Sequence, residues 1–152
     1  MKKEINANAR KAYELSLKKT KSDFEQIKVN SSADSAAYAR QFYHEDLTIY
    51  ESSFIMLLNG AQRVIGWVKI GQGGVSTTSV DIKLVCKYAI ESLAVAVVLV
   101  HNHPSGNKKP STIDERLTKD LRNSLELFQC KLLDHIILTE DDYYSFVDNG
   151  ML

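Results

Sequence analysis

A short segment of the chain carries three side chains that can bind one metal ion. His101 and His103 stand two residues apart at the end of an apolar run, and Asp114 follows after a polar loop. In an extended chain, residues i and i+2 point the same way about 6.5 Å apart, so one ion can reach both imidazoles. Two imidazoles and a carboxylate leave a fourth position for water, as in catalytic zinc sites. The segment therefore indicates hydrolysis by an activated water.

The same residues also fit interpretations without a metal. A histidine pair of this spacing can arise by chance or from core packing. Ser111 and Asp114 are three residues apart at an expected helix start, which is also the pattern of a capping box. That spacing places both side chains on one face of the first turn, so capping and metal binding can coexist. The order of apolar strand, histidine pair, loop and helix start favours the metal site, and Asn102 is expected to point to the other face and shape the turn.

The elements around this segment predict a mixed α/β domain. Residues 94–100 (AVAVVLV) are apolar and β-branched, which is typical of a central strand covered on both faces. Ser111 is expected to open a helix to about residue 129. The other predicted elements are a helix over 31–45, a hairpin of 53–59 with 63–70, a helix from Thr78 or Ser79 to 93, and strands at 131–138 and 143–147. Residues 1–30 are predicted to be an arm with a weak amphipathic helix around Ala12, Leu15 and Leu17, and residues 31–152 to be the domain.

The charge balance and the length of the apolar runs exclude some classes of binding partner. The chain has 152 residues, with 19 basic residues balancing 19 acidic ones, so a partner bound mainly by charge, such as duplex DNA, is not expected. The longest apolar run, 93–100, is far short of the roughly 20 residues that span a bilayer, and residues 1–20 lack the apolar stretch of a signal peptide. The expected location is therefore the cytoplasm, with no membrane association. Cys86 and Cys130 do not form a disulfide framework and are expected to be small buried hydrophobes.

The spacing of the polar segment resembles that of a known family. The JAMM or MPN+ metalloproteases, which carry a JAB domain, have the pattern H-x-H, seven residues, S, two residues, D, with a glutamate upstream. His101, His103, Ser111 and Asp114 fit this pattern without a gap, and Glu51 fits the upstream glutamate, with Glu45 as a nearby competitor. Within the family the chain is most similar to the RadC-like proteins, on the segments HNHPSG (101–106), DHIIL (134–138) and YYSF (143–146).

The resemblance implies a fold, a cofactor and a reaction. The fold would be a three-layer mixed β-sheet between helices, similar to the cytidine-deaminase fold. Zn²⁺ would be held by His101, His103 and Asp114, and Glu51 would move a proton from the attacking water to the leaving amine. Ser111 would help to stabilise the oxyanion. The expected substrate is a protein or peptide with an amide or isopeptide bond, a ubiquitin-like conjugate among the candidates.

Three other functions fit the sequence less well. RadC-type proteins usually carry a helix-hairpin-helix region that suggests DNA contact, but residues 1–39 are too short for it and lack its glycine motif, which disfavours a DNA-repair module. A metal-binding interaction domain without turnover is disfavoured by the intact ligand set. A deaminase would need H-x-E and P-C-x-x-C motifs, which the sequence lacks. Of the remaining histidines, His135 is expected to pack behind the site and His44 to lie on a helix surface.

Overall fold

The computed structural model describes residues 12–43, 47–73 and 80–152. Its elements in chain order are α1 (Ser32–Ala39), the 3₁₀ turn η1 (Arg40–Phe42), β1 (Ser52–Leu58), β2 (Val64–Gln72), α2 (Ile82–Glu91), β3 (Ala96–Asn102), α3 (Thr112–Glu126), β4 (Lys131–Leu138) and β5 (Tyr143–Ser145). The strands form one sheet in the order β2-β1-β3-β4-β5. Only β3 and β4 are parallel, so the sheet is mixed.

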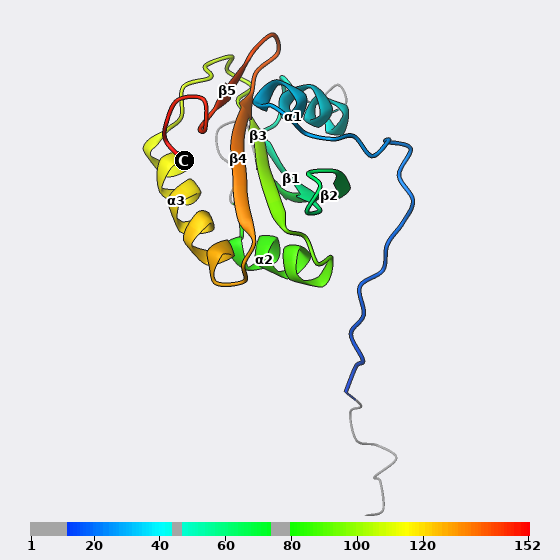
Figure 1. The fold of residues 1–152 in the computed structure, drawn as a ribbon. Helices are drawn as coiled ribbons and strands as arrows, with labels where there is room; N and C mark the ends of the chain where they lie inside the picture. The colour runs from blue at the N-terminus through cyan, green and yellow to red at the C-terminus, as the bar shows by residue number, and fades with distance from the viewer. Residues whose placement is uncertain (1–11, 44–46, 74–79) are drawn as a thin grey trace, which may run out of the picture.

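Helices cover both faces of this sheet (Figure 1). One face packs against α1 and η1 through a cluster that includes Phe42, Phe54, Met56, Val98 and Ile136. The other packs against α2 and α3 through a cluster that includes Ile55, Val85, Leu99, Leu121 and Leu125. The predicted three-layer α/β fold is therefore confirmed, whereas its similarity to the cytidine-deaminase fold stays a prediction.

The central strand β3 is buried along its whole length. Its alternation sends Val97 and Leu99 to the α2 and α3 face, and Val98 and Val100 to the α1 face. Continuing this alternation places His101 on the α3 face and Asn102 on the α1 face. The C-terminal end of this strand therefore supplies functional groups to both faces of the sheet.

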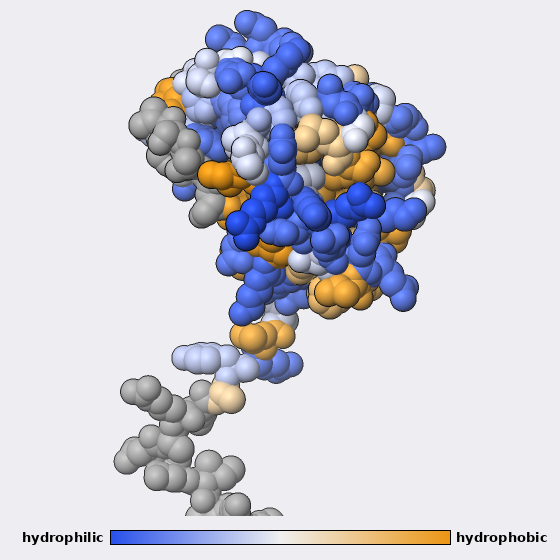
Figure 2. All heavy atoms as spheres, turned by 90° about the vertical axis from the view of Figure 1, so that its left-hand side faces the viewer, coloured by the Kyte–Doolittle hydropathy of each residue, from blue (hydrophilic) through white to orange (hydrophobic). Residues whose placement is uncertain are grey.

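Helix α3 begins close to the end of β3 and covers one face of the sheet. Its N-terminus carries a complete capping box formed by Ser111 and Asp114, which satisfies backbone N–H groups that have no partner within the helix. Leu121 and Leu125 face the core, while Figure 2 shows that the outer side of this part of the molecule is largely hydrophilic, with separate hydrophobic patches. Among the described residues, no helix is long and apolar enough to cross a membrane.

Two local predictions differ from the structure. Residues 12–21 form no helix, and Tyr13 and Leu15 are about nine-tenths exposed (91% and 90%). The predicted arm helix is wrong over this range because a short amphipathic segment without a packing surface is not stable in water. The N-cap of α2 is Asp81, whose side chain accepts a hydrogen bond from the backbone N–H of Lys83. The predicted caps Thr78 and Ser79 lie outside the described residues.

The last part of the predicted arm contacts the folded body. Val29 is buried, and Phe24 and Ile27 pack against the cluster on the α1 face. The backbone N–H of Val29 donates to the carbonyl of Gln62, next to the start of β2. The division of the chain at residue 30 stays a prediction, and residues 1–11 of the arm lie outside the described residues.

A buried carboxylate joins β4 to the C-terminal segment. Asp134 accepts hydrogen bonds from the backbone N–H groups of His135 (2.7 Å) and Val147 (3.2 Å) and from the hydroxyl of Ser145 (2.6 Å). Burial raises the pKa of Asp134 and outweighs these hydrogen bonds, which lower it. The negative charge therefore carries a cost in the folded state, while the hydrogen bonds hold the two segments together.

This contrast predicts different effects for two substitutions of Asp134. Asp134→Ala leaves three donors without a partner and should lower the free energy of unfolding by about 1–3 kcal/mol. Asp134→Asn keeps a carbonyl acceptor and adds an N–H that the Ser145 hydroxyl can accept, so it should cost less. Because the folded-state pKa is raised, the wild-type carboxyl is most favourable below about pH 4 and loses stability as the pH rises. Urea unfolding from pH 4 to 8 should therefore show Asp134→Asn gaining on wild type, and a constant difference would contradict the assignment.

Candidate metal centre

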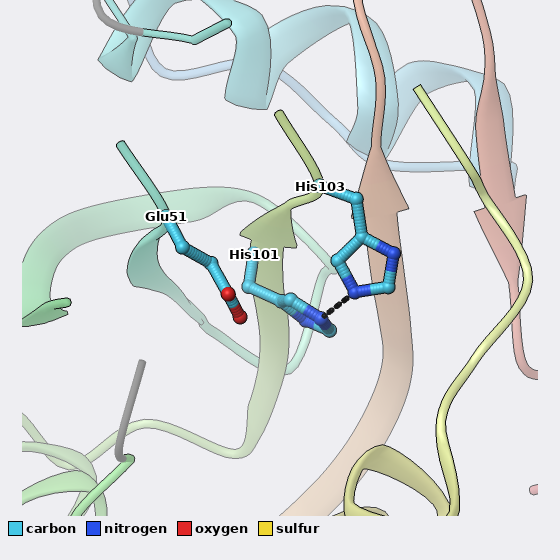
Figure 3. Close-up of side chains that lie close together, drawn as sticks. All are labelled: Glu51, His101 and His103. Carbon is cyan, nitrogen blue, oxygen red and sulfur yellow. Dashed lines mark hydrogen bonds between the residues drawn. The ribbon is translucent and has the colours of Figure 1, made fainter. Parts of the chain in front are cut away.

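Three side chains from two distant parts of the sequence meet at one end of the sheet (Figure 3). Glu51 immediately precedes β1, His101 lies near the C-terminal end of β3, and His103 is the first residue after β3. Their ligand atoms all lie within 4.8 Å of one another. The antiparallel pairing of Ser53 with His101 brings the start of β1 beside the end of β3, and this explains how Glu51 reaches the histidines.

Asp114 completes the group from the first turn of α3. The Nε2 atoms of His101 and His103 lie 3.0 Å apart. Asp114 Oδ1 lies 3.2 Å from the Nε2 of His101, and Asp114 Oδ2 lies 3.7 Å from the Nε2 of His103. Ligand atoms bound at 2.0–2.1 Å in a tetrahedron are about 3.3 Å apart. The three separations lie on both sides of this value, so the three side chains fit a single zinc-sized ion.

The loop after His103 determines which of its nitrogens is free. The Nδ1 of His103 lies 2.7 Å from the backbone carbonyl of Asn107. Because a carbonyl can only accept, Nδ1 carries the proton, and the neutral ring presents a lone pair at Nε2. Gly106, at φ +77°, makes the turn that brings this carbonyl back to the ring. The backbone N–H of His103 donates to the carbonyl of Leu138, which fixes the ring's position against β4.

The carboxylate of Asp114 serves the helix cap and faces the histidines at the same time. Its Oδ2 accepts from the backbone N–H (2.7 Å) and the hydroxyl (2.6 Å) of Ser111. Burial raises the pKa of Asp114, but the His101 ring, which in its protonated form donates a hydrogen bond and carries a charge, outweighs burial together with the hydrogen bonds from Ser111, and that pKa lies well below the usual range. Asp114 is therefore ionised, as a metal ligand must be. The hydroxyl of Ser111 would have to turn from Asp114 to act on an oxyanion, and its catalytic role stays a prediction.

Asn102 contributes to the site in a way that the sequence pattern does not indicate. Its fully buried side chain accepts from the backbone N–H of Ser52 (2.7 Å) and donates to the carbonyls of Tyr50 (2.8 Å) and Leu47 (2.5 Å). Two of these partners are the immediate neighbours of Glu51. Asn102 therefore fixes the backbone that carries Glu51. The signal in the sequence was a polar residue at a strand end, between two histidines that are candidate metal ligands.

Two buried side chains lie behind the histidine pair, and only one of them, His135, was predicted from the sequence. His135 is fully buried, stacks on Phe146 with ring centroids 4.6 Å apart, and places Nε2 2.8 Å from the Nδ1 of His101. Burial, and then the charge of His101, lower the pKa of His135 well below its usual value. Its position behind the site agrees with the interpretation of a packed histidine. Thr118, whose hydroxyl lies 2.6 Å from the Nδ1 of His135, was not foreseen. His44 and the competing Glu45 lie outside the described residues.

Comparison with known proteins identifies the family. The profile of the family described as RadC-like JAB domain matches residues 29–151, which is most of the chain. The chain belongs to the RadC-like JAB domain family. It is similar to proteins named UPF0758 protein from Flavobacterium johnsoniae (38% identical over 124 residues, 82% of this chain and 53% of that protein) and Porphyromonas gingivalis (40% over 103 residues, 67% and 45%). A third such protein, from Geotalea uraniireducens, is 38% identical over 112 residues, covering 73% of this chain and 49% of that protein.

The RadC-like domain thus spans about half the length of the curated relatives that it matches. The candidate centre lies outside a hollow of about 990 Å³ between residues 17–26 and β2. None of Glu51, His101, His103 and Asp114 lines that hollow. The site is therefore recognised by its chemistry rather than by the depth of a pocket.

The geometry predicts one metal ion per chain, with a defined ligand set. His101→Ala, His103→Ala and Asp114→Asn should each lower zinc affinity by more than the roughly 10–100-fold that is typical of changes behind the ligands. Glu51→Gln should leave the affinity nearly unchanged, because in this ligand set Asp114, whose carboxylate lies 3.2 and 3.7 Å from the two histidine nitrogens, supplies the third ligand. Competition with a chromophoric chelator measures these affinities.

The same titration at several pH values provides a second check. Imidazole must be neutral to bind a metal, and its ordinary pKa is about 6.5. Binding should therefore weaken as the pH falls below about 6. The depressed pKa of Asp114 keeps this carboxylate ionised throughout the range. A protein that takes up no metal after zinc addition, or an Asp114→Asn protein with wild-type affinity, would contradict the assignment.

Proposed function

We propose that the domain is a zinc-dependent hydrolase of the metallopeptidase type, which cleaves an amide or isopeptide bond. Membership of the RadC-like JAB domain family and the candidate metal site fit a metal-dependent hydrolase. One observation above all supports the metallopeptidase-type reaction. A third side chain, Glu51, lies within 4.8 Å of two histidines that Asp114 already contacts on the α3 side. Three ligands and a separate carboxylate are what hydrolysis by an activated water requires.

Each residue has a distinct role in this proposal. His101, His103 and Asp114 would hold zinc, which when bound supplies a Lewis acid for the scissile carbonyl and acidifies a nearby water molecule. Glu51 would accept the proton of the attacking water and deliver it to the leaving nitrogen. The Ser111 hydroxyl would stabilise the oxygen on which negative charge develops. Asn102 would keep Glu51 in place by holding the backbone on both sides of it.

The proposed substrate is a peptide or protein, a ubiquitin-like conjugate being one candidate, and the proposed location is the cytoplasm. The position of the centre supports a large substrate. The side chain of His103 is 17% exposed, whereas that of His101 is 3% exposed. The centre therefore opens to solvent on the side of the 103–110 loop, where a polypeptide can approach. An interaction domain without turnover would have no use for a carboxylate held as Glu51 is.

Glu51→Gln separates an enzyme from a metal-binding domain without turnover. The substitution is nearly isosteric, so the protein should fold and retain zinc. Its amide cannot take up a proton, and loss of a positioned base typically lowers the rate by about 10²–10⁴-fold. Turnover would be measured on a substrate first found in a library of peptide and isopeptide bonds, with zinc content determined on the same samples.

Glu45→Gln is the matched control, because Glu45 is the other glutamate just upstream of β1. It should retain nearly full activity. Equal turnover by wild type and Glu51→Gln would remove Glu51 from the mechanism. A zinc-loaded wild type that cleaves no amide in the library would favour the interaction domain instead.

A further inference from the structure

A buried chain of hydrogen bonds runs behind the candidate metal centre and joins two of its proposed ligands. The hydroxyl of Thr118 lies 2.6 Å from the backbone carbonyl of Asp114 and 2.6 Å from the Nδ1 of His135. The Nε2 of His135 lies 2.8 Å from the Nδ1 of His101. All three side chains are almost completely buried, with Thr118 and His101 each 2% exposed and His135 0%. Water therefore cannot replace these contacts.

The direction of each hydrogen bond in this series follows from the first acceptor, which is the backbone carbonyl of Asp114. The carbonyl of Asp114 can only accept, so the single hydroxyl proton of Thr118 is donated to it. Towards His135 the same hydroxyl can then only accept, and the proton of the His135 ring therefore sits on Nδ1. A neutral imidazole has one N–H, so the Nε2 of His135 accepts, and the Nδ1 of His101 donates to it.

This order leaves a lone pair on the Nε2 of His101. That atom lies 3.0 Å from the Nε2 of His103 and 3.2 Å from Asp114 Oδ1. The carbonyl of Asn107 assigns a lone pair to the Nε2 of His103 as well. Two lone pairs and a carboxylate thus converge with no proton between them. Such an arrangement is unfavourable unless a cation lies among the three groups.

We propose that Thr118 and His135 are positioning residues that fix the tautomer of His101 and so make its Nε2 the metal-binding nitrogen. The inference rests on the metal site of the proposed function but not on its reaction. Neither residue touches the point where the ligands converge, and both act through His101. This series of hydrogen bonds begins at the backbone of Asp114 and ends at the ring of His101. It therefore orients one ligand from α3 and one from β3 together.

Thr118→Val tests this inference with little change in shape. Without the hydroxyl, the Nδ1 of His135 has no acceptor, so its proton is better placed on Nε2, where it can be donated to the Nδ1 of His101. The proton of His101 then moves to its Nε2 and points at Asp114. This proton satisfies the metal-free site and competes with the metal. Zinc affinity should fall by about 10–100-fold, the usual effect of removing a partner of a metal ligand.

The experiment compares wild type, Thr118→Val, Thr118→Ser and Thr139→Val at one pH. Thr118→Ser restores the hydroxyl and should recover most of the zinc affinity. Thr139 is another buried threonine, whose hydroxyl bonds with Asp142 in the 139–142 turn, and its substitution should leave the affinity unchanged. Zinc affinity is measured by chelator competition. Nitrogen-15 spectra of the metal-free histidine rings report the tautomers, and His101 should change from Nδ1–H to Nε2–H only in Thr118→Val.

The outcomes separate this inference from the proposed function. Wild-type zinc affinity in Thr118→Val, or a loss of affinity with the His101 tautomer unchanged, would overturn the positioning role and leave the proposed hydrolase standing. A wild-type protein that binds no zinc would overturn both. Weak zinc binding together with a changed tautomer in Thr118→Val, both reversed in Thr118→Ser, is the result that the inference requires.

Discussion

At the end of β3, successive residues must point to opposite faces of the sheet, and the arrangement of the site depends on this constraint. His101 falls on the face covered by α3, where Asp114 and His135 meet it. Asn102 falls on the opposite face, where it holds the backbone around Glu51. A shift of one residue in the register of β3 would exchange the two side chains and dismantle both halves of the centre. The long buried pairing of β3 with β1 and β4 opposes such a shift.

The affinity of the centre for a metal ion follows from the lone pairs of His101, His103 and Asp114, which all point to one place. Asp114 is held as an anion by its cap with Ser111, and hydrogen bonds from the histidine rings to Asn107 and His135 direct lone pairs inward. The folded chain therefore gathers acceptor atoms and a negative charge at one point before any ion arrives. The helix cap, usually a device for stability, here also sets the orientation of a ligand. Capping and metal binding, which are alternative interpretations of the sequence, coexist in one side chain.

The sequence predicts what is local and misses what depends on long-range register. The apolar run before His101, the histidine pair and the Ser111–Asp114 cap are contiguous features, so the strand, the helix start and their convergence could be predicted. Glu51 was identified only through a family pattern, because β-sheet pairing and not spacing brings it to the histidines. The bond from Thr118 to His135 depends on the packing of α3 against β4, which no local pattern encodes. The arm helix was predicted from periodicity alone and fails because nothing packs against it.

The central claim is that the histidine pair and Asp114 form a metal centre, and X-ray absorption at the zinc edge of the loaded protein tests it most directly. We predict a coordination shell of nitrogen and oxygen at about 2.0–2.2 Å with imidazole scattering from two rings. Replacing His101 and His103 by alanine should remove that scattering together with the bound zinc. Sulfur scattering at about 2.3 Å, which would place the ion at Cys86 or Cys130, or a zinc shell that survives the double substitution, would contradict the account.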